Sequence, residues 1–263
     1  GWVKNLNRNK VFNYFHEHTD SFPDLKLVTG GVAYEEIPNV EKIKNYKKIP
    51  GIRYSENYKT WYYTYNTALH IEKNRPVQMR VKEGLVPFQE YAPYPLLLPR
   101  ISPVGIDFQF SQREKNRNVF TSANNLKTAA IICYEVVFDR ILYKAAQNGA
   151  QAFFVILNEG WYDAKKVPRQ FLQLSIIRAI ETRRSIAHAS NLGISAFINQ
   201  RGEVIAKTQS KSPDFLKHEM KMNRTTTFAA RMGNYIGILA FLTTIFLLIY
   251  ESFYFVKNRK RKS

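Results

Sequence analysis

Apolar and polar positions in the first third of the chain predict one helix followed by three strands. Apolar residues recur at helical spacing over residues 10–18, which indicates an amphipathic helix. A largely apolar run that leads into two glycines predicts a buried strand over residues 25–34. Residues 65–71 and 77–82 have strand patterns and are separated by a short polar turn, so they predict a hairpin.

From residue 127 onward, apolar strands alternate with helices. The pattern predicts strands over residues 129–132, 153–157 and 186–190, helices over 136–147 and 169–184, and a final hairpin of 193–198 and 203–206. In the second of these helices, Phe171, Leu174, Ile177 and Ile180 are expected on one apolar side. Several strands are apolar throughout, as in sheets with covered faces. The sequence therefore predicts an α/β layered domain.

Two segments depart from this alternation. Residues 91–121 are rich in proline and then polar, which predicts an extended loop. Residues 235–256 carry one charged side chain, Glu251, and about 20 apolar residues suffice to span a bilayer. The basic residues that follow at 257–262 predict a cytoplasmic tail by the positive-inside rule, with the preceding domain across the membrane. The alternative is a buried C-terminal helix of a soluble protein.

The chain is strongly basic and contains a single cysteine. It has 39 Lys and Arg against 21 Asp and Glu, a formal net charge of +18. Such a charge attracts phosphates, and composition does not choose between nucleic acid and anionic lipid. One cysteine, Cys133, excludes an intramolecular disulfide and a Cys-rich zinc site. Cys133 is therefore either core filler or a reactive thiol.

Two positions could carry chemistry. Cys133 lies where a predicted strand meets a predicted helix, and there backbone N–H groups and the helix dipole favour a thiolate. The N–H of Tyr134 could also hold an oxyanion. Free cysteines are common in cores, so position alone leaves both interpretations open. Lys82 ends a strand eight residues before Glu90, and the two could form a fixed charge pair, although a solvated lysine is the simpler interpretation.

Four segments, taken in order, resemble the signatures of the nitrilase superfamily, specifically its apolipoprotein N-acyltransferase branch. They are KEGLVPFQEY at residues 82–91, ICYEVVF at 132–138, NEGWY at 158–162 and RAIETRRSIAHASNLGISAFINQRGEVI at 178–205. That branch typically has K-x-x-L-V-P-F-G-E-Y, I-C-Y-E and N-D-x-W-F. The resemblance runs from about residue 65 to 206 and continues through the apolar segment, so it covers most of the chain.

The resemblance implies a fold and a set of site residues. The fold is a nitrilase-like αββα sandwich followed by a C-terminal transmembrane helix. Cys133 would be the nucleophile, Lys82 the group that stabilises the tetrahedral intermediate, and Glu90 the carboxylate that supports it. The residues that the resemblance places at the substrate or acyl site are Tyr134, Glu135, Asn158 and Trp161. It implies neither a metal nor a cofactor.

The implied reaction moves an acyl chain from a phospholipid, through a cysteine thioester, to the N-terminal amine of a lipidated cysteine in an apolipoprotein. The expected partners are the phospholipid donor, the diacylglyceryl-lipoprotein acceptor and the membrane, with no nucleic acid, and we expect a monomer. The expected location is the bacterial inner membrane, with a periplasmic catalytic domain and a cytoplasmic C-terminus. We also expect residues 91–110 to form part of a lid over the acyl chain.

The predicted organisation is a nitrilase-like catalytic domain over residues 1–215 that lacks its N-terminal strand, a juxtamembrane connector over 216–234, a transmembrane helix over 235–256 and a basic tail over 257–263. Gln89, Glu159 and Tyr162 depart from the typical motifs. The family's general-base glutamate belongs to a W-P-E-T-A-like segment that is expected upstream of Gly1, so the chain by itself should have little activity. The alternatives are a membrane-anchored nitrilase-type amidase and a non-catalytic lipid-binding module.

Overall fold

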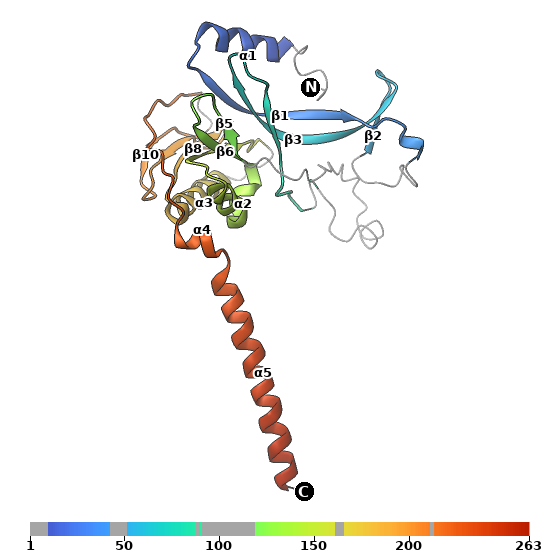
Figure 1. The fold of residues 1–263 in the computed structure, drawn as a ribbon, viewed down its shortest axis with the longest axis vertical. Coiled ribbons are helices and arrows are strands. Elements are labelled where there is room, and N and C mark those ends of the chain that lie inside the picture. Colours follow the sequence, from blue (N-terminus) through green and yellow to red (C-terminus); the bar gives the residue numbers. More distant parts are fainter. Residues whose placement is uncertain are drawn as a thin grey trace.

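Two β-sheets form the centre of the fold, and helices lie on both outer sides (Figure 1). A computed structural model describes residues 10–42, 52–87, 90, 119–160, 166–210 and 213–262. In the first sheet the order is β1-β3-β2, β4 also pairs with β3, and every pairing is antiparallel. Its strands are β1 (Lys26–Glu36), β2 (Ile52–Ser55), β3 (Thr60–Glu72) and β4 (Gln78–Val81).

The second sheet has the order β10-β9-β8-β7-β6-β5. Its strands are β5 (Phe120–Thr121), β6 (Lys127–Ile132), β7 (Ala152–Leu157), β8 (Ser185–Ser190), β9 (Ala196–Ile198) and β10 (Val204–Lys207). The three central strands β6, β7 and β8 are parallel, while the outer pairings are antiparallel. The carboxyl ends of the three parallel strands therefore meet at one edge of this sheet.

Three apolar clusters show that the fold has four layers. Helix α1 (Lys10–Ser21) contributes Phe15 to a cluster with Leu69 and Ile71 on the outer side of the first sheet. Ala68 of the first sheet packs with Ala130 of the second, so the two sheets face each other. Helices α2 (Asp139–Gln147) and α3 (Val167–Thr182) cover the other side of the second sheet. The predicted αββα sandwich is thereby confirmed.

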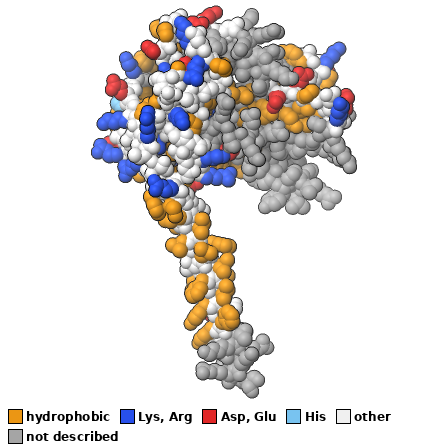
Figure 2. Space-filling model, in the orientation of Figure 1, with side chains coloured by type: hydrophobic (Ala, Val, Ile, Leu, Met, Phe, Trp, Pro, Cys, Tyr) orange, Lys and Arg blue, Asp and Glu red, His pale blue; other side chains and the backbone are white. Residues whose placement is uncertain are grey.

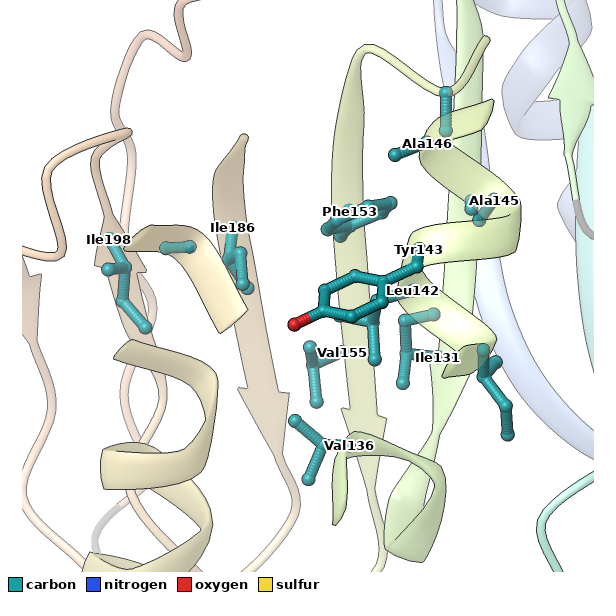
Figure 3. Packing of buried hydrophobic residues seen from close by; sticks show 14 of the residues in the cluster. Ile131, Val136, Leu142, Tyr143, Ala145, Ala146, Phe153, Val155, Ile186 and Ile198 are labelled. Carbon is teal, nitrogen blue, oxygen red and sulfur yellow. The ribbon is translucent and has the colours of Figure 1, made fainter. Parts of the chain in front are cut away.

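The largest cluster lies between the second sheet and helices α2 and α3. Figure 3 shows Leu142 of α2 pointing toward Ile131 and Val155 of the sheet, with Phe153 beside them. All four side chains have an exposed fraction of 0%. Full burial of one such side chain contributes roughly 1.5–3 kcal/mol. This side of the second sheet therefore anchors β6 and β7 in the core.

The two sheets approach each other closely at Gly30 of β1. A Cβ atom at this position would lie 3.2 Å from Cγ2 of Ile156 on β7, closer than most side-chain contacts. Glycine removes that atom and lets the first sheet lie against the carboxyl half of β7. This close packing matters because Lys82 follows β4 of the first sheet, whereas Cys133 follows β6 of the second.

Most predicted elements are present, and three predictions were wrong in detail. The helix expected over residues 136–147 begins at Asp139, after a 3-10 turn over Cys133–Val137. Residues 120–121 lie in β5, not in the predicted loop. In α3 the expected apolar side includes Ile177 and Ile180, which are 46% and 43% exposed. The buried positions of α3 are Phe171, Leu172, Ser175, Arg178, Ala179 and Thr182, several of them small, because small side chains let the helix approach the sheet.

The chain ends in two helices beyond the sandwich. Residues 213–227 contain no helix or strand, α4 spans Phe228–Met232, and α5 spans Tyr235–Lys262. Helix α5 extends away from the domain as a single rod (Figure 1). Hydrophobic side chains cover the part of it that is not grey in Figure 2. Its segment Tyr235–Tyr254 is long and apolar enough to cross a membrane, and none of it is buried.

Candidate active site

Cys133 lies immediately after β6, at the sheet edge where the parallel strands end. Its backbone is left-handed, with a φ of 52°, and the following 3-10 turn bends the chain away from the strand. Non-glycine residues rarely adopt this conformation, and it costs about 1–3 kcal/mol when the surrounding structure enforces it. The strain presents the thiol at the sheet edge, where a substrate could reach it.

Opposing effects act on the pKa of the Cys133 thiol. Burial raises the pKa, and this is the largest effect. The charge of Lys82 and hydrogen bonds from the backbone N–H groups of Tyr134 and Asn158 lower it, while Glu90 raises it. The net pKa lies above its ordinary value. The backbone N–H groups thus act in the direction that the sequence predicts, but desolvation outweighs them.

Lys82 and Glu90 form a close ion pair beside the cysteine. Lys82 is 1% exposed, and its Nζ lies 2.7 Å from both carboxylate oxygens of Glu90. Glu90 also accepts hydrogen bonds from Asn66 Nδ2 at 2.9 Å and from the backbone N–H of Val86 at 2.8 Å. The interpretation of Lys82 as a solvated strand-end lysine is thereby excluded. The ammonium is buried, held in one position and close enough for its charge to act on the thiol.

Glu135 is a fully buried carboxylate. It joins the 3-10 turn Cys133–Val137, the cysteine turn, to the segment after β4 that carries Lys82 and Gly84, the lysine loop. Arg80 of β4 donates to it through two nitrogens, at 2.6 and 3.0 Å. Backbone N–H groups of Glu83 and Gly84 donate at 2.5 and 3.2 Å, and that of Ile132 donates at 2.7 Å. Both carboxylate oxygens accept hydrogen bonds from protein groups, and the residue is 0% exposed. Its contacts fix the segments that carry Lys82 and Cys133 relative to each other.

Gly84 allows the lysine loop to approach this carboxylate. A Cβ atom at residue 84 would lie 2.8 Å from Cδ2 of Phe138 and 3.1 Å from Cγ of Glu135. Any larger residue would push the loop away from the turn. Phe138 in turn packs edge-to-face with Tyr134, with ring centroids 5.4 Å apart. Gly84 thus lets the lysine loop pack directly against Phe138 and Glu135.

A second cluster of polar residues lies at the carboxyl ends of β7 and β8. The exposed side chain of Asn158 accepts a hydrogen bond from Asn191 Nδ2 at 2.7 Å, and the backbone N–H of Glu159 donates to Asn191 Oδ1 at 3.0 Å. The carboxylate of Glu159 accepts from Ser190 Oγ and is otherwise buried against Gly193. Burial raises the pKa of Glu159, and the Ser190 hydrogen bond lowers it in part. These contacts position the Asn158 N–H that faces the thiol.

The turn after Cys133 is also supported from behind. Arg178 of α3 donates through Nε to the carbonyl of Val136 at 3.0 Å and through Nη2 to that of Val137 at 2.8 Å. Its Nη1 pairs with Glu181 at 2.6 Å. These carbonyls end a short turn that would otherwise leave them without partners. The cysteine turn is therefore held from the lysine loop through Glu135 and from the helix layer through Arg178.

The structure brings most of the predicted site residues together. Cys133, Lys82, Glu90, Tyr134, Glu135 and Asn158 share the sheet edge described above. Trp161 and the proposed lid over residues 91–110 lie outside the described residues. In the described part of the chain, His, Cys, Asp and Glu side chains do not gather in groups of three that could hold a metal.

Sequence reasoning missed Arg80, Asn66 and Arg178 as site residues. Arg80 lies two positions before Lys82, on the same side of the strand, and that alternation could have indicated a shared environment. Asn66 is placed by the pairing of β3 with the end of β4, where its carbonyl accepts from the Lys82 N–H, and its side chain contacts Glu90 in the following turn. Arg178 lies more than 40 residues from the cysteine, and its sequence neighbours gave no signal of that contact.

Fold and site together define a class of protein. Residues 48–230 match the carbon-nitrogen hydrolase family, and the chain belongs to it. Among curated proteins it is similar to an apolipoprotein N-acyltransferase of Chlorobaculum tepidum, 31% identical over 175 residues that make up 64% of this chain and 33% of the relative. An apolipoprotein N-acyltransferase 1 of Treponema denticola is 28% identical over 200 residues, 71% of this chain and 36% of the relative. The resemblance expected from the motifs is confirmed, and the chain spans about a third of these relatives' length.

Solved structures show weaker likenesses. A carbon-nitrogen hydrolase from Helicobacter pylori G27 aligns with a TM-score of 0.48 and 12% identity, covering 80% of this chain and 66% of its own. Saccharomyces cerevisiae Nit3, a member of the nitrilase superfamily, aligns with a TM-score of 0.46 and 14% identity, covering 76% and 61%.

Proposed function

We propose that the chain carries the catalytic centre of an acyltransferase that moves an acyl chain from a phospholipid to the N-terminal amine of a lipidated cysteine in an apolipoprotein. One observation carries this proposal: a strained cysteine whose thiol faces two backbone N–H groups and a buried lysine. The names of the curated relatives supply the acceptor class, an apolipoprotein that is N-acylated, and the phospholipid donor is part of the proposal. In this proposal residues 1–215 are the catalytic domain and 216–234 the connector to the membrane.

The first half-reaction begins at the thiol of Cys133. The sulfur attacks the carbonyl carbon of a phospholipid ester, and the oxyanion that forms is stabilised by Lys82 and by backbone N–H groups such as that of Tyr134. The carbon–oxygen bond then breaks, the lysophospholipid leaves as an alcohol after taking a proton, and a thioester remains. In the second half-reaction the amine attacks the thioester, an amide forms and the thiol is restored.

The proton transfers need a general base, and Glu90 is poorly placed to act as one. The thiol has a raised pKa and must lose its proton before or during attack. Glu90 is the carboxylate that acts on the thiol in the described part of the chain, and its oxygens are already paired with Lys82 and Asn66. We therefore propose that a further glutamate, outside the described residues, serves as the general base, and that without it turnover is slow.

The membrane helps both substrates reach the site. We propose that residues 235–256 of α5 cross the inner membrane, with the basic tail in the cytoplasm and the catalytic domain in the periplasm. Phospholipid and lipidated protein both lie in the bilayer, so a tethered domain meets them at high local concentration. The excess of positive charge suits a surface of anionic head groups.

The proposal is tested in membranes from cells that express the gene containing this sequence. Phospholipid with a radiolabelled acyl chain should label the protein in a bond that hydroxylamine cleaves, and Cys133→Ser should abolish the label. Label on a folded, membrane-inserted protein that survives hydroxylamine would contradict a thioester. Absence of label, together with release of ammonia from small amides, would instead indicate a membrane-anchored amidase. Absence of both would indicate a non-catalytic lipid-binding module.

A further inference from the structure

Apolar side chains stand exposed where the sandwich meets α5. Phe228 and Met232 of α4 are 63% and 51% exposed, and Tyr235 at the start of α5 is 38% exposed. The rings of Phe228 and Tyr235 pack edge-to-face with centroids 5.2 Å apart, so they form one apolar surface. Figure 2 shows hydrophobic side chains gathered at this junction, with Lys or Arg side chains beside them.

Helix α4 is divided into an inner and an outer side. Phe228 and Met232 are four residues apart and therefore share one side of the helix. Ala230, two residues from each, lies on the opposite side and has an exposed fraction of 0% because it packs into the main cluster. Arg231 is exposed and flanks the apolar side, and Arg224 is exposed just before the helix. The outer side is thus apolar with a basic border.

The sandwich holds α4 firmly from its inner side. Gln147 of α2 donates through Nε2 to the carbonyl of Ala230 at 2.6 Å. Thr227 caps α4 by accepting from the backbone N–H of Ala230 at 3.1 Å, and its hydroxyl donates to the carbonyl of Glu181 at the end of α3 at 2.5 Å. The outer side of α4 therefore has a fixed orientation relative to helices α2 and α3.

The distance to α5 places this outer side at the edge of a bilayer. Only Gly233 and Asn234 separate α4 from Tyr235, where the apolar helix begins. Three residues of chain reach at most about 10 Å. If α5 crosses the membrane, as the proposed function states, α4 lies at head-group depth, where aromatic and basic side chains are favoured.

We propose that α4 is an interfacial foot: Phe228 and Met232 enter the boundary between head groups and acyl chains, and Arg224 and Arg231 bind anionic phospholipid head groups. The foot joins the bilayer to α2 and α3, so it fixes the height and tilt of the catalytic domain above the membrane. This inference rests on the proposed membrane span, and it adds a second point of contact to it. The two-residue link before α5 sets the distance of the domain from the bilayer, and the foot adds a contact that sets its orientation.

The test measures depth in the bilayer at single labelled positions. In the full chain with Cys133→Ser, single cysteines are introduced as Met232→Cys, Leu242→Cys or Tyr58→Cys and labelled with a polarity-sensitive fluorophore. The protein is reconstituted in vesicles of phosphatidylethanolamine and phosphatidylglycerol that contain lipids with a quencher near the head group or deep in the acyl chain. Leu242 lies in α5, and Tyr58, which is 67% exposed between β2 and β3, is the matched surface control.

The label at residue 232 should lose emission to the shallow quencher, the label at 242 to the deep quencher, and the label at 58 to neither. Arg231→Gln in the same background should reduce the shallow quenching at 232. If 242 is quenched while 232 behaves like 58, the span stands and the foot is disproved. If 242 is not quenched, both the span and the foot are disproved. Equal quenching at 232 with and without phosphatidylglycerol would overturn the assignment of anionic head groups.

Discussion

At the scale of single residues, burial and charge act in opposite directions on the thiol of Cys133. Burial raises its pKa, whereas the Lys82 ammonium lowers it. Lys82 is itself buried and paired with Glu90, so its charge acts through protein rather than through water. Lys82 therefore increases the thiolate fraction of the cysteine, although burial has the larger effect on the pKa.

Replacement of Lys82 should make the thiol less reactive. Lys82→Met removes the charge that lowers the pKa of Cys133 and leaves Glu90, which raises it, without its partner. A rise of one unit lowers the thiolate fraction at neutral pH about tenfold, so we expect alkylation by iodoacetamide to slow on the order of tenfold. The rate is measured against pH on the full chain in detergent. Lys207→Met, at an exposed strand end, is the control, and an equal rate in both variants would contradict the electrostatic role.

His188 makes stability depend on pH through its burial. Its Nδ1 lies 2.8 Å from Ser175 Oγ, its Nε2 is buried without a hydrogen-bond partner, and burial lowers its pKa from 6.5 to about 4. The unfolded chain therefore takes up a proton near pH 6.5, whereas the folded chain does so only near pH 4. The free energy of unfolding should fall by roughly 3 kcal/mol as pH decreases across this window, and this loss should stop below pH 4.

Chemical denaturation in detergent between pH 4 and pH 7 measures this dependence. His188→Gln should flatten the curve over the window, and His18→Gln, at an exposed position of α1, should leave its slope unchanged. Equal slopes in the native chain and in His188→Gln would show that other groups cause the acid sensitivity.

The residues of the site could be predicted from sequence only where they belong to a motif. Cys133, Lys82 and Glu90 lie in long matched segments, and the structure brings them together. Arg80 could not be assigned, because its importance comes from a buried carboxylate 55 residues away. Nor could the raised pKa of Cys133, since a sequence gives the order of elements but not the depth of burial.

At the scale of elements, the site depends on how the end of β4 is held against the turn after β6. The connection is the buried pair of Arg80 and Glu135, together with three backbone N–H groups that donate to the same carboxylate. Each strand by itself is fixed by its own sheet, whereas their relative position is fixed by this pair. A loss of the pair should therefore affect stability and reactivity together.

Arg80→Met should leave Glu135 buried without its counterion. Removal of one partner of a buried ion pair costs about 3–5 kcal/mol, so we expect a large drop in the free energy of unfolding. Thiol alkylation at Cys133 should also change its pH profile, because Lys82 loses its fixed distance from the thiol. Arg201→Met breaks an exposed ion pair with Glu203 and should change neither. A destabilised variant with an unchanged pH profile would show that Arg80 has a structural role alone.

The sequence predicted the type of each element better than it predicted which side of the element is buried. The alternation of strands and helices predicted an α/β layered domain, because periods of 2 and 3.6 differ strongly, whereas the two-sheet sandwich was implied by the family resemblance. The buried side of α3 was wrong because Ser175, Ala179 and Thr182 carry little hydrophobic signal, yet they allow close packing. The helix after Cys133 was predicted too early, because a 3-10 turn has apolar spacing much like that of an α-helix.

At the scale of the whole molecule, the apolar part of α5 is the feature on which the proposed membrane location rests. Its exposed side chains have no partner within the described domain, so lipid is the environment that suits them. The direction of insertion then depends on the charges at its ends. Five Lys and Arg lie between residues 257 and 262, against Lys217, Lys221, Arg224 and Arg231 in residues 215–234 before the span.

A C-terminal fusion reports this orientation. Fused after Ser263, green fluorescent protein should fluoresce and alkaline phosphatase should be inactive, because both outcomes require a cytoplasmic C-terminus. Gln in place of the five basic tail residues should weaken this preference and raise phosphatase activity. The same number of Gln substitutions at exposed Lys and Arg of the sandwich is the control. Active phosphatase on the native chain would reverse the proposed topology.

The left-handed backbone at Cys133 has a consequence for how such proteins diverge. Folding alone favours glycine at a position with a φ of 52°, so if Cys133 is the proposed nucleophile, we expect its reactivity to be what keeps a cysteine there. A descendant released from that constraint gains stability by exchanging Cys133 for Gly, a change that cannot restore chemistry. Among related sequences, glycine at this position, with Arg80 and Glu135 retained, would mark chains that keep the architecture as a binding scaffold after the reaction is lost.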